Sequence, residues 1–313
     1  MNALFFRLQH RYAPYLFVAP FVVLFLTFTL YPIIKSILLS FYITNGPKSQ
    51  IFVGWDNFRF LWGDPAFHKA VKNTCIYALC SVFLQLPLSL GLALLLNSRL
   101  VKGRDFFRFS FFSPHLVGQV FVAVLFSVVF IPKFGLLNRV LHALVGTAID
   151  TKWLGSPELV MPALVLTSLW MYVGFNMIYF LAALQAVDGE LYEAAQVDGA
   201  GAFKQFVHVT LPGIRSVAVF VTVLSTIGSF QLFELPYVML SNTAGPDNAG
   251  LTVVMYLFQN GFIAGDLGYA SAIGWTLTMG VLVISLAQMR LTGTWKRESR
   301  SEEHTSELQS PDH

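Results

Sequence analysis

Apolar residues gather into six long stretches along the chain, separated by shorter polar segments. Crossing the hydrocarbon core of a bilayer takes about 20 mainly apolar residues in a helix, and all six stretches are long enough. Backbone hydrogen bonds must close within each segment in lipid, so these stretches predict helices and an all-α integral membrane fold. Among Asp, Glu, Lys and Arg residues, only Glu234 lies inside them. The predicted spans are 15–34, 75–96, 109–130, 159–184, 216–240 and 269–288.

The basic residues between the spans predict their orientation. Lys and Arg are enriched in cytoplasmic loops, and here they are densest before the first span, after the second and after the sixth. With an even number of spans, this distribution predicts that both termini lie in the cytoplasm. The residues concerned are Arg7, Arg11, Arg99, Lys102, Arg104, Arg108, Arg290, Lys296 and Arg297.

The composition supports a membrane protein and argues against several other classes. Of the 313 residues, 55% are hydrophobic and 12% are charged, against roughly 25% charged residues in soluble domains. The net charge of +3 comes from residues that flank the spans and form no single patch, which indicates membrane lipid and no nucleic acid as a partner. The sequence has no G-x-x-x-x-G-K-[ST] phosphate loop, no nucleophile–base pair and no metal-ligand spacing. We therefore expect no catalysis and no bound metal or cofactor in this chain.

Residues 188–212 form a polar, small-residue segment between the fourth and fifth predicted spans. Asp188 can cap a helix, and Gly199 can end it because glycine adopts a left-handed conformation at little cost. Residues 202–211 can form a second short helix that stops before Pro212. The segment is predicted to be a cytoplasmic helix–turn–helix whose small side chains let another protein approach closely. The alternative is an amphipathic helix that lies in the membrane surface and holds two spans together.

The sequence "EAAQVDGAGAFKQFVHVTLP" resembles the EAA loop of binding-protein-dependent ABC importer permeases. The family pattern is Glu-Ala-Ala, a Gly six residues after the Glu, and a hydrophobic-x-Leu-Pro ending. In the family the loop lies between spans five and six, whereas it lies between spans four and five by the count used here. The segments "GRDFFRFSFFSP", "SFQLFELPYVM" and "GYASAIGW" resemble the carbohydrate-uptake branch. The segments "LYPIIKSILLSFY" and "FVGWDNF" resemble the first permease of a heterodimeric sugar importer.

The resemblance implies a transport subunit that is not itself an enzyme. In the family, the loop docks in a cleft of a cytoplasmic ATPase, whose closure on ATP and Mg²⁺ turns the pore from inward-facing to outward-facing. The implied partners are two ATPase subunits, a second permease of different sequence, and an extracytoplasmic solute-binding protein that delivers a sugar. The implied location is the cell (inner) membrane of a bacterium or archaeon.

The family motif also assigns roles to residues of the loop. We expect Glu193 to pair with a basic group of the ATPase, Gly199 to provide the turn, and the alanines to allow close packing. The residues expected to take part in ATPase coupling are Glu193, Ala194, Ala195, Asp198, Gly199, Ala200, Leu211 and Pro212.

Four residues inside the spans are candidates for the substrate path. Polar residues are costly inside a bilayer and are functional candidates for that reason. Asn176 and Gln231 offer amides for sugar hydroxyls, and Trp170 offers an aromatic face, although packing is the alternative for Trp170. Glu234 lies about 27 Å along the fifth span, so we expect it near the outer mouth. There it is either an acceptor or gate in the pore, or a water-exposed interfacial carboxylate.

Other cargoes and another class of transporter remain as alternatives. Glycerol phosphate or another polar solute fits the same architecture, although an anionic cargo favours a basic pore and the spans contain no Lys or Arg. A secondary transporter would show inverted repeats and paired charges within its spans, and neither is visible. We expect a single permease domain over residues 1–299. Residues 300–313 resemble a translated sequencing adapter, so no prediction of fold or function includes them.

Overall fold

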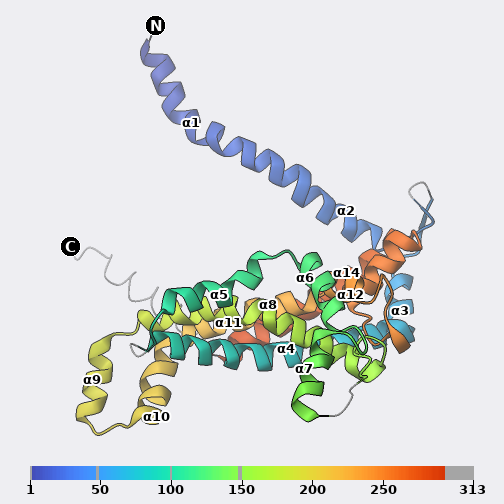
Figure 1. Ribbon diagram of the computed structural model, residues 1–313. Helices are drawn as coiled ribbons and strands as arrows, with labels where there is room; N and C mark the ends of the chain where they lie inside the picture. The colour runs from blue at the N-terminus through green and yellow to red at the C-terminus, as the bar shows by residue number, and fades with distance from the viewer. Residues whose placement is uncertain (1, 47–48, 99–100, 147–149, 293–313) are drawn as a thin grey trace. The chain divides into compact units, whose positions relative to one another are not determined.

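The computed structural model describes residues 2–46, 49–98, 101–146 and 150–292 (Figure 1). The predicted adapter-like segment 300–313 lies outside these residues. The elements in chain order are α1 (Asn2–Phe25), η1 (Leu26–Leu30), α2 (Tyr31–Leu39), β1 (Tyr42–Thr44), β2 (Gln50–Phe52), α3 (Asp56–Gly63), α4 (Pro65–Asn97), α5 (Arg104–Leu116), α6 (Gln119–Val129), α7 (Leu136–Val145), α8 (Pro157–Gln185), α9 (Gly189–Val197), α10 (Ala202–Gln205), η2 (Phe206–Thr210), α11 (Leu211–Phe230), α12 (Glu234–Met239), η3 (Pro246–Asn248), α13 (Val253–Phe258), η4 (Gln259–Ile263) and α14 (Leu267–Leu291).

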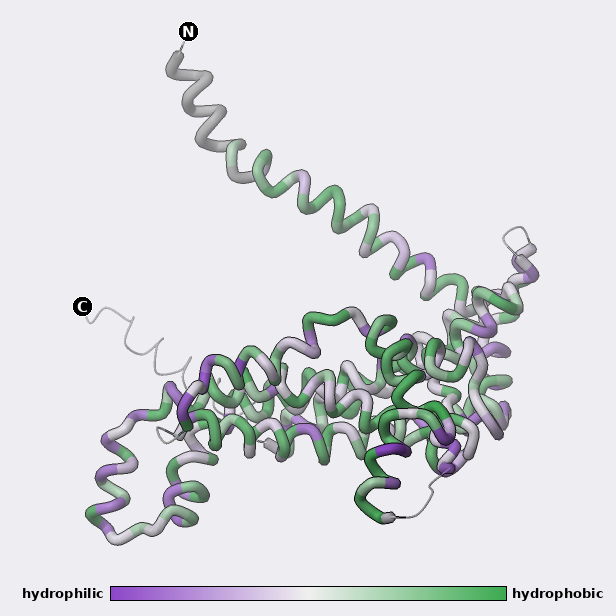
Figure 2. The backbone as a smooth tube through the Cα atoms, in the orientation of Figure 1, coloured by the Kyte–Doolittle hydropathy of each residue, from purple (hydrophilic) through white to green (hydrophobic). Residues whose placement is uncertain are grey.

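Long apolar helices dominate the described part of the chain, as an all-α integral membrane fold requires. Within it, five helices are long and apolar enough to cross a bilayer, and the bent pair α5–α6 gives a sixth if it counts as one span. Figure 2 shows mostly hydrophobic and neutral colours along the bundle that contains α4, α8 and α11. The five helices are Tyr15–Leu39, Pro65–Asn97, Pro157–Gln185, Ala202–Phe230 and Leu267–Leu291.

The described residues form two compact units, one within residues 2–64 and 257–276 and one within residues 65–256 and 277–292. In the first unit, Asp266 is the main polar anchor. Its Oδ1 accepts hydrogen bonds from the backbone N–H groups of Thr44 at 3.1 Å and Tyr269 at 3.0 Å. Asp266 therefore caps the start of α14 and fixes it to the short antiparallel β1–β2 hairpin. The hydrophobic pattern did not predict this hairpin.

The second unit is a helical bundle in which α4 and α8 form the most extensive pair. The Ser89 hydroxyl of α4 donates to the carbonyl oxygen of Val173 on α8 at 2.8 Å. Helix α8 also approaches α5 at Gly174, where an added Cβ would lie 1.7 Å from the carbonyl oxygen of Phe111. Small residues allow such close backbone approach between membrane helices. The position of α5 against α8 thus depends on a residue without a side chain.

Two of the predicted spans differ from the structure. The predicted span 109–130 is two helices, α5 and α6, bent by 99°, because Val117 and Gly118 between them have extended backbone. The predicted span 216–240 is also not one helix, because α11 ends at Phe230 and α12 begins at Glu234. In that break the buried Thr252 hydroxyl donates to the carbonyl oxygen of Leu232 at 2.7 Å. A residue distant in sequence thus satisfies a backbone group that a continuous helix would have paired internally.

The prediction that a second loop helix stops before Pro212 is wrong. One helix runs from Ala202 to Phe230 and contains a π-helical turn, η2, directly before Leu211. In that turn the N–H of Leu211 donates to the carbonyl oxygen of Phe206. Pro212 follows directly in the first residues of α11, inside the continuous helix, and a local π-helical adjustment is one of the ways in which a membrane helix accommodates a proline. The helix therefore passes through the proline.

Candidate functional site

Helices α9 and α10 project from the bundle of α4, α5, α8 and α11 as a helical loop (Figure 1). The loop begins at Asp188, whose Oδ1 accepts a hydrogen bond from the backbone N–H of Glu190 at 3.0 Å. Asp188 has extended backbone and α9 begins at the next residue, so it is the N-cap that the sequence predicted. A side-chain acceptor at this position satisfies one of the free N–H groups of the first helical turn.

The turn after α9 is a Schellman motif. The N–H of Gly199 donates to the carbonyl oxygen of Gln196 at 3.0 Å, and the N–H of Ala200 donates to that of Ala195 at 2.8 Å. Gly199 has φ +76°, a left-handed conformation that costs other residues about 1–2 kcal/mol. The predicted turn at Gly199 is therefore confirmed. The left-handed conformation of Gly199 and the two backbone hydrogen bonds define it.

Side chains join the two legs of the loop. The Gln205 amide of α10 donates to the carbonyl oxygen of Ala200 at 2.8 Å. The hydroxyl groups of Tyr192 and Thr210 lie 3.0 Å apart and share a hydrogen bond, which connects α9 to the π-helical turn. The loop is thus attached to the helix that continues as α11.

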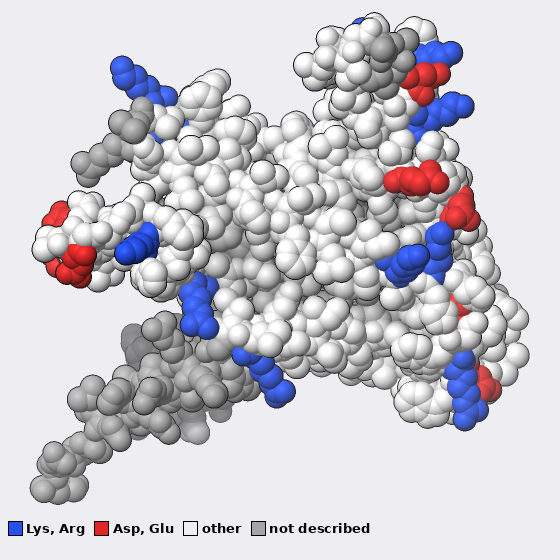
Figure 3. Space-filling model, turned by 90° about the horizontal axis from the view of Figure 1, so that it is seen from below, with Lys and Arg blue, Asp and Glu red and all other residues white. Residues whose placement is uncertain are grey.

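The outer surface of the loop combines acidic, small and apolar side chains. Figure 3 shows acidic groups gathered at its outer end. The apolar side chains of Val197 and Phe203 are 88% and 78% exposed, so both legs of the loop offer apolar surface to a partner. Of the residues expected to take part in coupling, Ala195 and Ala200 are half-buried, and the exposed ones are Glu193, Ala194, Asp198, Gly199, Leu211 and Pro212.

A cavity of about 370 Å³ lies among α4, α6, α8, α11 and α12. Three of the four candidates for the substrate path line it: Asn176, Gln231 and Glu234. The Asn176 amide is buried and donates to the Ser225 hydroxyl at 3.1 Å. Gln231 and Glu234 are exposed and lie on either side of the break that ends α11. The sequence predicted that Glu234 lies inside a continuous span. In the structure it is instead the first residue of α12, directly after the helix break.

Trp170, the fourth candidate, is not among the residues that line the cavity. It lies on α8 with 42% of its surface exposed, and its ring centroid is 5.4 Å from that of Phe126. This position fits the packing role that the sequence left open for it.

Several residues that line the cavity were not singled out from the sequence: Tyr77, Gln85, Gln119, Tyr172, Ser225 and Ser229. Gln119 donates a hydrogen bond to the Tyr172 hydroxyl and so connects α6 to α8. The two glutamines lie inside apolar stretches, so the rule that selected Asn176 could have found them. The serines and tyrosines carry no such signal, because both types are common in membrane helices as packing residues.

The cavity can hydrogen-bond a neutral polyhydroxyl compound. It offers amide and hydroxyl groups beside the side chain of Phe175, with one carboxylate and no Lys or Arg among its described lining residues. Convergent polar groups in a partly apolar pocket orient small-molecule ligands. In the part of the chain that the structure describes, no three His, Cys, Asp or Glu side chains form a group that could hold a metal ion.

Comparison with known proteins identifies the family. Residues 85–294 match the sequence profile of the family described as binding-protein-dependent transport system inner membrane component. The arabinooligosaccharides transport system permease protein AraP of Bacillus subtilis (strain 168) is 42% identical over 288 residues, which is 91% of this chain and 90% of that protein. The lactose transport system permease protein LacF of Rhizobium radiobacter is 34% identical over 88% of this chain and 92% of its own.

A solved structure supports the same family. The fold matches a chain of the bacterial alginate ABC transporter, crystallised in complex with an alginate pentasaccharide-bound periplasmic protein. The TM-score is 0.79 and the identity 25%, over 93% of this chain and 97% of that chain. Permease subunits are transport components and not enzymes. The chain therefore belongs to the binding-protein-dependent inner membrane components, the permease subunits of ABC importers.

Proposed function

We propose that this chain is the permease subunit of an ATP-driven importer for a sugar or related polyol. The observation that carries the proposal is the continuous helix Ala202–Phe230. At one end it is part of the exposed loop that resembles the EAA motif, and near its other end Ser225 and Ser229 line the cavity. A helix of this length spans about 40 Å. Movement of the loop would therefore reach the cavity through a single element.

The proposed cargo is a neutral oligosaccharide or polyol. The relatives named for transport of arabinooligosaccharides and of lactose support this class, as do the amides and hydroxyls of the cavity. Asn176 and Gln231 would bind sugar hydroxyls, and the Glu234 carboxylate would accept a hydrogen bond from them. An anionic solute such as glycerol phosphate would meet repulsion from Glu234, because no basic residue lines the cavity among its described members.

We further propose an orientation and a set of partners. The loop and both termini would face the cytoplasm, as the distribution of Lys and Arg indicates. Two ATPase subunits would bind ATP and Mg²⁺, and one of them would receive Glu193 and the neighbouring alanines. A second permease would complete the pore, and a solute-binding protein would deliver the sugar on the opposite side of the membrane.

Co-purification with a sugar-importer ATPase and the second permease tests the docking of the loop. Ala194→Trp places a large side chain on the exposed surface that we assign to docking, and Gln196→Trp places the same side chain about 200° around α9. Both positions are exposed, so both variants should fold and insert. We expect that wild type and Gln196→Trp retain the ATPase, whereas Ala194→Trp loses it.

Two outcomes would count against the proposal. Equal retention of the ATPase by the two tryptophan variants would mean that the motor docks elsewhere. Loss in both variants, with normal membrane insertion, would mean that any bulk on α9 disturbs docking and that Ala194 has no special part in it.

A further inference from the structure

A second hollow in the structure lies outside the proposed substrate path. It is a groove of about 710 Å³ along α4 and α8. One row of α4 residues forms its first wall: Lys69, Lys72, Ile76, Cys80 and Leu84. These positions recur every three to four residues, so they share one face of the helix. Basic residues stand at one end of this row and apolar residues fill the rest.

Residues of α8 form the opposite wall, and there too a charged residue precedes apolar ones along the helix. On α8 it begins with Glu158 and continues through Met161, Val165 and Leu169. Glu158 lies in the first turn of α8 and is exposed. Both walls of the groove thus run from a charged end to an apolar end.

The length of the groove fits a lipid chain and not a transmembrane helix. From Lys69 to Leu84 the rise along α4 is about 22 Å, and from Glu158 to Leu169 along α8 it is about 17 Å. One leaflet contributes about 15 Å of the roughly 30 Å hydrocarbon core. A neighbouring transmembrane helix needs a groove through the full core, and α4 continues to Asn97 without lining this groove further.

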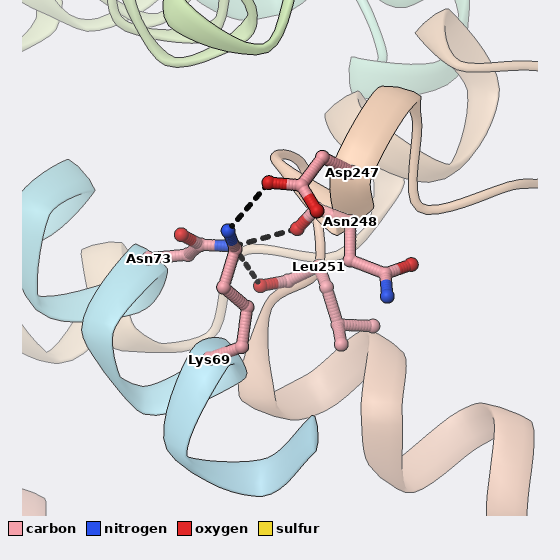
Figure 4. A network of polar contacts seen from close by, with 5 residues as sticks. All are labelled: Lys69, Asn73, Asp247, Asn248 and Leu251. Atoms are coloured by element: carbon pink, nitrogen blue, oxygen red, sulfur yellow. Dashed lines mark hydrogen bonds and ion pairs between the residues drawn. The ribbon is translucent and has the colours of Figure 1, made fainter. Parts of the chain in front are cut away.

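The charged end of the groove carries balanced charges. Lys69 pairs with Asp247 at 3.2 Å, and the Asn73 amide donates to the carbonyl oxygens of Asn248 at 2.8 Å and Leu251 at 3.0 Å (Figure 4). Lys72 is exposed and forms no ion pair with any residue that the structure describes. With Glu158 opposite, this end offers one cation and one anion that are not paired with each other.

We propose that this groove binds one phospholipid with a zwitterionic headgroup that carries a primary amine. One acyl chain lies along the apolar row from Ile76 to Leu84. The phosphate is bound by Lys72, and the ammonium group is bound by Glu158. A lysine ammonium binds a phosphate group as a point charge, and the acidic partner across the groove selects a headgroup without net charge. The proposal does not depend on the cargo or on the docking of the loop.

Native mass spectrometry of the full chain in detergent tests the site. The chain is titrated with phosphatidylethanolamine, phosphatidylglycerol and phosphatidylcholine that carry the same acyl chains. Cys80 lies in the groove and is exposed, whereas Leu79 is 58% exposed and does not line it. Cys80→Trp fills the groove, and Leu79→Trp places the same bulk beside it, so the two variants are matched.

We expect one phosphatidylethanolamine per chain for wild type and for Leu79→Trp. Cys80→Trp should weaken this binding about tenfold, because it displaces two or more methylene groups of the lipid. Lys72→Gln should weaken it about fivefold through loss of one charge at the headgroup. Phosphatidylcholine should bind less tightly than phosphatidylethanolamine, because its quaternary ammonium cannot donate a hydrogen bond to Glu158.

Three results would overturn the proposal. Equal lipid binding by the two tryptophan variants would show that the groove holds no lipid. Tighter binding of phosphatidylglycerol would show that Glu158 does not select the headgroup. Loss of assembly with the second permease in Cys80→Trp, with lipid binding unchanged, would show that the groove is a protein interface.

Discussion

The projecting loop and the cavity lie at opposite ends of one helix, yet they are built in different ways. The loop is held by contacts between residues close in sequence, such as the cap at Asp188 and the turn at Gly199. The cavity depends on residues from five elements and on Thr252, which bonds a carbonyl 20 positions earlier. Local motifs can therefore be changed without moving the cavity, whereas a packing change should move the cavity and leave the loop formed. The comparison predicts which substitutions separate coupling from solute binding.

The largest effect is expected at Gly174. Gly174→Ala would place a Cβ 1.7 Å from a backbone oxygen of α5, so the helices must separate. We expect a loss of about 3 kcal/mol in the free energy of unfolding, with the cavity distorted and α9 unchanged. Thermal unfolding in detergent measures the loss, and hydrogen exchange reports on α9. Gly91→Ala is the control because nothing lies within 4 Å of its added Cβ. Equal stability of the two variants would contradict the close approach of α5 and α8.

Thr252→Val should have the next largest effect. It removes the hydroxyl that donates to Leu232 and accepts from the N–H of Met255, and it leaves both backbone groups buried without that partner. We expect a loss of about 2 kcal/mol together with weaker solute binding, because Gln231 and Glu234 flank the released segment. Unfolding in detergent and sugar binding by calorimetry check the two effects. Thr252→Ser keeps the hydroxyl and should behave as wild type. An unaffected Thr252→Val would mean that the break persists without this bond.

Gly199→Ala should show the converse behaviour. Its left-handed backbone costs an alanine about 1.5 kcal/mol, and the strain falls on the loop alone. We expect faster hydrogen exchange in α9 and weaker ATPase retention, with sugar binding unchanged. Gly201→Ala is matched to it, because Gly201 has φ −67° and open space at its Cβ. Altered sugar binding in Gly199→Ala alone would mean that the loop and the cavity are not separable.

Asp188→Ala should have the smallest effect of the four. Removing the cap costs about 1 kcal/mol of local helix stability, so the first turn of α9 should exchange faster while the melting temperature barely changes. Asp188→Asn keeps an acceptor oxygen and should restore protection. If both variants exchange alike, the cap contributes through its charge and not through its hydrogen bond.

The sequence alone located the loop correctly because its determinants are local. Asp188 and Gly199 each act on backbone groups within a few residues, and residue type alone indicates both roles. The long apolar helices could be located for a similar reason, because an apolar stretch of sufficient length has few alternatives in a membrane.

The remaining features depend on residues that only the fold brings together. Pro212 was read as a stop, because the π-helical turn that precedes it has no recognisable residue pattern. The hydroxyl of Thr252 pairs a carbonyl in the break after Phe230, and the position of α5 depends on the absence of a Cβ at Gly174. Asn176, Gln231 and Glu234 were identified as costly polar residues, yet their convergence on one cavity could not be deduced without the helix break.

The continuous helix from loop to cavity can be tested by distances between spin labels. Phe203→Cys and Leu224→Cys place one label at each end, about 32 Å apart along the helix, in a background where Cys75 and Cys80 are replaced by serine. A third label at Leu79→Cys on α4 reports movement of the helix relative to the bundle. When ATP is trapped in the assembled transporter, we predict an unchanged distance between 203 and 224 and a changed distance between 203 and 79. A changed distance between 203 and 224 would show that the helix bends near Pro212 and does not transmit loop movement to the cavity.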